Sequence, residues 1–138
     1  MCLCAWETRF VTFVASCTRK KRMFAANNYA SSLCSLGRFE DAKSLLRKIM
    51  PVARRELGEE NETMLRMREL YAMTLCLENG GTLDNIREAV ATMEDVERIA
   101  RRVLGGAHPL TTANEGALRR ARAALARAPP PPSPSGDV

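Results

Sequence analysis

The residues of this chain that could carry nucleophilic or metal chemistry are its cysteines and its one histidine. They are Cys2, Cys4, Cys17, Cys34, Cys76 and His108. The odd number and irregular spacing of the cysteines argue against a disulfide framework. A zinc site needs four ligands at workable spacing, and no second pair follows the C-x-C of residues 2–4. We therefore expect no metal site.

A catalytic centre needs a nucleophile, a base and an orienting group that lie together. No such set can be placed in this sequence, because a Cys–His pair would have to bring the distant His108 beside a cysteine. His108 precedes Pro109, which favours a structural role in a turn before a helix. The sequence predicts a protein that is not an enzyme and that needs no cofactor.

Composition favours one domain of packed helices. The chain has 138 residues, of which 46% are hydrophobic and only 5% aromatic, so aliphatic side chains and alanine must build the core. The net charge of +5 is mild for a nucleic-acid-binding protein, and no ladder of aromatic and basic residues accompanies it. A solvated basic surface is the favoured interpretation.

The longest apolar run, Phe10 to Ala15, is too short to cross a bilayer. The basic residues at 19–22 follow this run, whereas a signal peptide would carry them before it. Cysteines without a disulfide framework are expected to stay reduced, as is usual in cytosolic proteins. We expect a cytoplasmic protein with no membrane partner.

Apolar residues recur at helical spacing in five segments. The expected helices span about residues 20–36 and 39–57, then from a cap at residue 61 or 63 to residue 77, from residue 83 or 84 to 103, and 109–126. The apolar period continues past Pro51, which predicts a kink there without a break. Gly37 is expected to end the first helix in a left-handed conformation. Thr112 and Glu115 have the spacing of a capping box for the last helix.

The first helix is expected to bury one stripe of side chains against its neighbours. That stripe is Met23, Ala26, Tyr29, Ala30, Leu33 and Leu36. Asn61 or Thr63 is expected to cap the third helix. Three segments follow from this pattern: residues 23–127 as a repeat domain, 128–138 as a disordered Pro-rich tail, and 1–22 as a poorly defined start. The start has two interpretations, the second helix of a missing preceding repeat or a disordered segment.

The helices form repeating pairs. Tyr29-Ala30 recurs as Tyr71-Ala72, 42 residues later, and Arg54-Arg55-Glu56-Leu57-Gly58 recurs as Arg101-Arg102-Val103-Leu104-Gly105, 47 residues later. Self-similar helical hairpins at this period indicate a solenoid, in which each hairpin buries its apolar face against the next. The predicted fold class is all-α, with about two hairpins and a C-terminal capping helix.

At these residues the sequence resembles the tetratricopeptide repeats of the kinesin light chain type. The matching stretches are Asn27-Asn28-Tyr29-Ala30, Gly37-Arg38-Phe39-Glu40-Asp41-Ala42 and Leu104-Gly105-Gly106-Ala107-His108-Pro109. The first connector departs from the pattern, with Asn61-Glu62 in place of His-Pro. The resemblance covers roughly residues 24–126.

The resemblance implies that the first helices of successive hairpins line a concave groove that receives peptides. Carried across by motif, the groove residues are Phe24, Asn27, Ser31, Arg66, Glu69, Met73 and Arg120. In the family, the first asparagine of the pair hydrogen-bonds the backbone of a bound peptide, a role that falls here to Asn27. Arg66 and Arg120 would favour an acidic peptide through charge-assisted bonds.

The predicted function is protein–protein binding by a scaffold module that takes a peptide or a partner helix. Two alternatives stay open. The chain could be an incomplete piece of a longer repeat scaffold with little independent activity. It could instead associate with nucleic acid through the basic segment between Arg98 and Arg127, which serves equally well as the polar outer face of the last helix.

Overall fold

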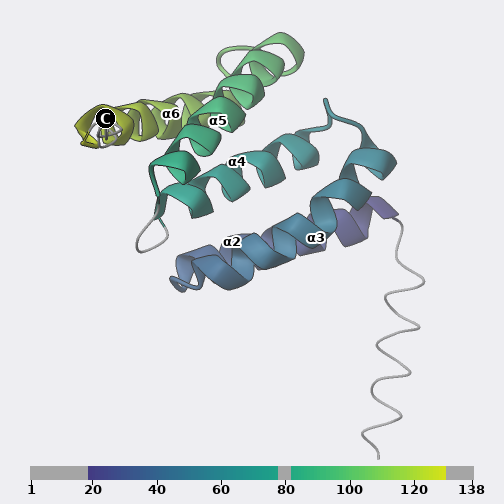
Figure 1. Cartoon of the computed structure of the whole chain (residues 1–138). Helices are drawn as coiled ribbons and strands as arrows, with labels where there is room; N and C mark the ends of the chain where they lie inside the picture. The colour runs from purple at the N-terminus through teal and green to yellow at the C-terminus, as the bar shows by residue number, and fades with distance from the viewer. Residues whose placement is uncertain (1–18, 78–81, 130–138) are drawn as a thin grey trace, which may run out of the picture.

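The computed structural model describes residues 19–77 and 82–129, and these residues form five helices without a strand (Figure 1). The helices are α2 (Arg19–Ser35), α3 (Phe39–Leu57), α4 (Glu62–Leu77), α5 (Leu83–Val103) and α6 (Pro109–Arg127). Each observed boundary lies within about two residues of the boundary predicted from the helical period. The predicted all-α fold class is confirmed.

The helices stack as two hairpins and a closing helix. α2 pairs with α3, α4 pairs with α5, and each helix packs against the next one along the chain. α2 also contacts α4, and α4 contacts α6, so the first helices of successive hairpins lie side by side. In Figure 1, α4 lies between the α2–α3 pair below it and the α5–α6 pair above it. This is the arrangement of a helical solenoid.

The core is centred on α4, which has neighbours on several sides. Its buried hydrophobic side chains are Met64, Leu65, Met67, Tyr71, Ala72 and Leu75. A helix that is apolar around most of its circumference must be enclosed by other elements, and here α3 and α5 flank it. Ala30 and Ala42 are fully buried, because small side chains let the helices of the first hairpin approach closely. Leu46 and Ala53 of α3 are buried in the same core, and the apolar side chains of Leu45, Ile49 and Leu57 pack against it.

Glycine ends α2 as the sequence predicts. Gly37 has a φ of 75°, a conformation that side chains with a Cβ rarely adopt. This turn lets the amide of Arg38 donate to the carbonyl of Leu33 at 2.9 Å and so satisfy the end of the helix. α3 then begins at Phe39, with Glu40 and Asp41 in its first turn, and continues unbroken through Pro51.

α6 starts at Pro109 as predicted, but the predicted capping box at Thr112 and Glu115 is wrong. His108 is the N-cap, and its Nδ1 accepts a hydrogen bond from the amide of Leu110 at 3.1 Å. The Thr112 hydroxyl instead donates to the Pro109 carbonyl at 3.0 Å, and the Glu115 carboxylate binds Arg101. The proline at the first helical position fixes the start one turn earlier than the threonine would.

Two residues of the predicted inner stripe of α2 are exposed, which corrects that prediction. Leu36 lies beyond the end of α2, and 73% of it is accessible. Tyr29 is in the helix but is 58% exposed. No element within the described residues covers either side chain. Ala30 and Leu33 of the same stripe are buried as predicted.

Some predictions concern residues outside the described ranges. These are most of the N-terminal segment 1–22, the turn at residues 79–81 and most of the Pro-rich tail 128–138. The proposed boundaries of the repeat domain at residues 23 and 127 therefore stay predictions.

Candidate functional site

A first hollow of about 140 Å³ lies between α2 and α4. It is lined by Asn27, Ser31, Arg66, Glu69, Leu70 and Met73. The two helices present these side chains because residues three and four apart share one face of a helix. Five of the seven groove residues expected from the sequence are thus brought together here.

Asn27 is the most enclosed polar group of this hollow. Its side chain belongs to a residue that is only 8% exposed, and its Oδ1 accepts no hydrogen bond from the described residues. A buried acceptor without a donor costs about 1–3 kcal/mol. A ligand that brings an N–H group into the hollow would satisfy this oxygen.

Arg66 and Glu69 give the hollow its charge. The guanidinium of Arg66 donates to the Glu62 carboxylate through Nε at 3.1 Å and through Nη2 at 2.7 Å, which fixes its direction. Burial raises the pKa of the Glu69 carboxyl, and the nearby charge of Arg66 partly offsets this effect. A raised pKa means that Glu69 takes up a proton at a higher pH than an exposed glutamate does.

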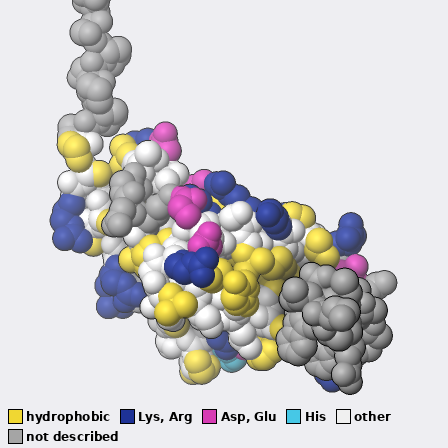
Figure 2. All heavy atoms as spheres, turned by 90° about the horizontal axis from the view of Figure 1, so that it is seen from below, with side chains coloured by type: hydrophobic (Ala, Val, Ile, Leu, Met, Phe, Trp, Pro, Cys, Tyr) yellow, Lys and Arg dark blue, Asp and Glu magenta, His cyan; other side chains and the backbone are white. Residues whose placement is uncertain are grey.

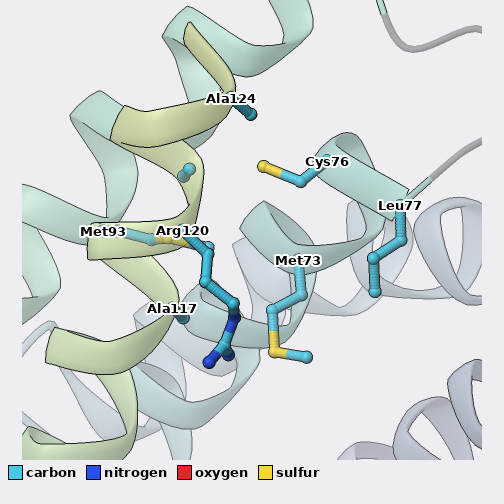
Figure 3. A pocket seen from close by; sticks show the side chains of 8 residues that line it. Met73, Cys76, Leu77, Met93, Ala117, Arg120 and Ala124 are labelled. Atoms are coloured by element: carbon cyan, nitrogen blue, oxygen red, sulfur yellow. The ribbon is translucent and has the colours of Figure 1, made fainter. Parts of the chain in front are cut away.

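A second hollow, of about 240 Å³, lies where α4 faces α6. It is lined by Met73, Cys76, Leu77, Met93, Ala117, Arg120, Ala121 and Ala124. Figure 3 shows Arg120 extending from α6 toward Met73 of α4, with Cys76 and Leu77 on the α4 side. Met73 lines both hollows, so the two join into one surface along α2, α4 and α6. We call this surface the groove.

Arg120 is the one charged residue of the second hollow. It is exposed, and it forms no ion pair with a carboxylate of the described part of the chain. The remaining lining is alanine, leucine, methionine and one half-buried thiol. This arrangement suits a ligand with an apolar group for the hollow and a negative charge at its mouth.

Six of the seven predicted groove residues line one or both hollows, and Phe24 lines neither. Phe24 lies on α2 and is 56% exposed. Seven lining residues were not among the predicted groove residues: Leu70, Cys76, Leu77, Met93, Ala117, Ala121 and Ala124. Met93 could not be found from the motif, because it comes from α5, whereas the motif places only residues of the first helices in the groove. Leu77 and Ala124 line the second hollow because the C-terminal parts of α4 and α6 lie on opposite sides of it.

The two cysteines in the described residues, Cys34 and Cys76, and the histidine lie in or next to helices of the stack. Cys34 and Cys76 are half-buried free thiols, and burial raises the pKa of each. His108 caps α6 as described, and its Nε2 lies 3.9 Å from the Glu62 carboxylate. Within residues 19–77 and 82–129, no three side chains of the ligating types lie together as a metal site would require.

Several arginines of the basic C-terminal part are paired with carboxylates. Arg122 binds Glu94 at 2.7 Å, and Arg98 binds Asp95. Arg101 binds both Glu97 and Glu115, and Arg102 reaches Glu60 in the α3–α4 connector. These pairs neutralise much of the positive charge that the sequence concentrates here.

Comparison with known proteins identifies the repeat. Residues 25–62 match the family model described as "Tetratricopeptide repeat", which spans α2, α3 and the connector to α4. No curated protein and no solved structure matches the chain. None of the helices seen in the described ranges is long and apolar enough to cross a membrane.

Tetratricopeptide repeats generally mediate protein–protein interactions and are generally not enzymes. The matched segment contains two of the three stretches that carry the resemblance, residues 27–30 and 37–42, and α4, α5 and α6 continue the same stack. The match and the helical stack together support a tetratricopeptide repeat protein with an all-α fold of repeated hairpins.

Proposed function

We propose that this protein binds a peptide, or one helix of a partner protein, in the groove formed by α2, α4 and α6. It acts as a non-enzymatic scaffold of the kinesin light chain-like type and works in the cytoplasm. The groove and the repeat match support this function.

The observation that carries the proposal is Asn27, which lines the first hollow and whose buried Oδ1 has no donor among the described residues. A helix surface without a ligand role would gain nothing from such a group, since its desolvation is not compensated. An extended peptide offers a backbone N–H group at regular intervals. One such group would occupy the first hollow while a side chain of the peptide enters the second.

The arginines define the chemistry of the ligand. Arg66 is already held by Glu62, whereas the exposed guanidinium of Arg120 has no described carboxylate partner. A carboxylate of the ligand would therefore gain most at Arg120, through a charge-assisted hydrogen bond of about 1.5–3 kcal/mol. We propose an acidic peptide with an apolar side chain near its negative charge.

The test is selection of ligands from a random peptide display library on the full chain, followed by affinity measurement by fluorescence polarisation. Selected peptides are expected to contain acidic residues. Asn27→Ala and Arg120→Ala are each expected to weaken binding about tenfold or more, which corresponds to about 1.4 kcal/mol.

Arg119 provides the matched control. It is the neighbour of Arg120 on α6, but it lines a different hollow between α5 and α6, together with Arg101 and Glu115. Arg119→Ala is expected to leave the affinity unchanged. Equal losses for the Arg119 and Arg120 variants, or full binding by the Asn27 variant, would refute binding in the groove.

The structure gives less support to nucleic-acid binding. The paired state of Arg98, Arg101 and Arg122 leaves few cations to replace counterions on a phosphate backbone. Titration of the full chain with duplex DNA and RNA at several salt concentrations is expected to show no steep salt dependence. A slope of several units in a plot of log K against log salt would favour this alternative.

A further inference from the structure

One face of α2 is exposed, whereas the equivalent faces of α4 and α6, the first helices of the following repeats, are buried. Ala25, Tyr29 and Ser32 lie on this face at helical spacing, and all three are exposed. Leu36 follows just beyond the helix and is exposed as well. Figure 2 shows the molecule from below, the side to which α2 and α3 lie closest in Figure 1, with hydrophobic side chains exposed among basic ones.

The next repeat shows what this face is built to contact. Residues 42 positions later, Met67, Tyr71 and Thr74, occupy the same face of α4 and are buried. α3 packs against α4, and its Arg47 donates to the Tyr71 hydroxyl at 3.3 Å. The Arg47 guanidinium also lies 5.9 Å from the centre of the Tyr71 ring. The second helix of the first hairpin thus covers this face of α4.

The same relationship holds one repeat further on. Leu118 and Asn114 lie 47 residues after Tyr71 and Met67, and both are buried. The Asn114 side chain donates to the Met93 carbonyl of α5 at 2.8 Å. The second helix of the preceding hairpin therefore covers α4 and α6 alike. Within the described residues, α2 is the one first helix that lacks this cover.

We propose that residues 1–18 form the missing cover and dock as a helix on the face of Ala25, Tyr29 and Ser32. This segment immediately precedes α2 in the sequence, just as α3 precedes α4. The α3–α4 connector takes only residues 58–61, so a connector of similar length leaves about fourteen residues for a helix of about 20 Å. α2 itself, with 17 residues, is about 25 Å long.

The composition of the segment fits a docked helix. Trp6, Phe10 and Phe13 are spaced four and three residues apart, which places them on one face of a helix. The equivalent face of α4 is covered by apolar side chains of α3. The Tyr29 face of α2 has no such cover within the described residues, and Trp6, Phe10 and Phe13 would supply it. Burial of one such side chain contributes roughly 1.5–3 kcal/mol. The segment would then cover the exposed face of α2.

Trp6 is the one tryptophan in the sequence, so its fluorescence reports the position of this segment alone. The experiment measures Trp6 emission and acrylamide quenching of the full chain at a concentration where sedimentation velocity shows a monomer. A docked Trp6 is expected to emit at shorter wavelength than N-acetyl-tryptophanamide and to be quenched several times less. Emission and quenching equal to those of the free amide would overturn the proposal.

A pair of variants places the segment on this face. Tyr29→Lys puts a charge into the contact and is expected to shift Trp6 emission toward that of the free amide. Val103→Lys, at a 43% exposed position at the end of α5, is expected to leave it unchanged. Helical circular dichroism checks that both variants fold.

Two other occupants give different results. Trp6 protected only at concentrations that produce a dimer would assign the face to a second copy of the chain and overturn the proposal. A protected Trp6 that does not respond to Tyr29→Lys would also overturn it, because the segment would then dock elsewhere.

Discussion

Asn61 and His108 each cap the helix that follows them, at equivalent positions of two connectors, although one side chain is an amide and the other an imidazole. The Asn61 Oδ1 accepts from the amide of Thr63 at 2.9 Å, and the His108 Nδ1 accepts from the amide of Leu110 at 3.1 Å. Each satisfies an amide that has no partner inside its helix. The first connector therefore departs from the His-Pro pattern in sequence, but Asn61 still supplies a cap for α4.

This equivalence predicts that His108→Asn retains the stability of the fold while His108→Ala does not. Loss of a side-chain cap costs about 1 kcal/mol, and asparagine is among the best caps. The measurement is urea unfolding followed by circular dichroism. Equal destabilisation by the two substitutions would show that the cap bond of His108 does not matter. Asn61→Ala serves as the parallel test in the first connector.

The ion pair between Arg68 and Asp95 predicts acid sensitivity. Arg68 of α4 is buried, and its hydrogen bond to Asp95 of α5 is the main cause that lowers the pKa of the Asp95 carboxyl. A carboxyl with a lowered pKa in the folded state stabilises the fold above its unfolded value, near about pH 4. This stabilisation is lost as the pH falls through the lower, folded-state pKa.

Asp95→Asn is accordingly expected to reduce the free energy of unfolding by about 1–3 kcal/mol at neutral pH. Below about pH 4 the difference from the unmodified protein should shrink progressively, and it should vanish once the pH is below the lowered pKa of Asp95, where the folded protein has also lost the charge. Asp84→Asn is the control, since Asp84 is highly exposed and pairs only with Arg87 of its own helix. A difference for Asp95→Asn that stays constant from pH 7 to pH 3 would contradict the ion-pair explanation.

The Asn114 side chain predicts a difference between two substitutions in α6. Its Nδ2 ties α6 to the Met93 carbonyl, while its Oδ1 is buried without a donor in the part of the chain described. Asn114→Ala loses the bond and leaves a cavity, so it should cost about 2 kcal/mol or more. Asn114→Met introduces the residue of the equivalent α4 position, Met67, and removes the unsatisfied acceptor.

The methionine variant is therefore expected to be more stable than the alanine variant by at least about 1 kcal/mol. Thermal and urea unfolding of both variants measure this difference. A methionine variant less stable than the alanine variant would mean that the pocket at residue 114 cannot accept the longer side chain.

Burial of Cys34 and Cys76 predicts slow reaction with thiol reagents. The raised pKa of each thiol leaves less thiolate at pH 7 than a free thiol, for which the value is about 8.5. In a variant with Cys2, Cys4 and Cys17 changed to serine, labelling by a disulfide reagent should be slower than that of glutathione. The rate should rise as the pH increases. Labelling as fast as glutathione at pH 7 would show that the thiols are not shielded.

The sequence predicted most of the local structure of this protein. Gly37 and the apolar period around Ala42 and Leu46 place the first hairpin, because helix spacing and glycine turns depend on neighbouring residues alone. The repeat of Tyr29-Ala30 as Tyr71-Ala72 gave the order of the stack. The same repeat, carried over by motif, named six of the thirteen residues that line the two hollows, and it also named Phe24, which lines neither.

Only the tertiary structure decided which of these matching residues are buried. Tyr29 and Tyr71 have the same place in the repeat, yet α3 packs against Tyr71 and no described element covers Tyr29. The contribution of Met93 to the groove likewise depends on how α5 lies behind α4 and α6. Helical spacing fixes which side chains share a face, whereas burial and hollows depend on what packs against that face from elsewhere in the chain.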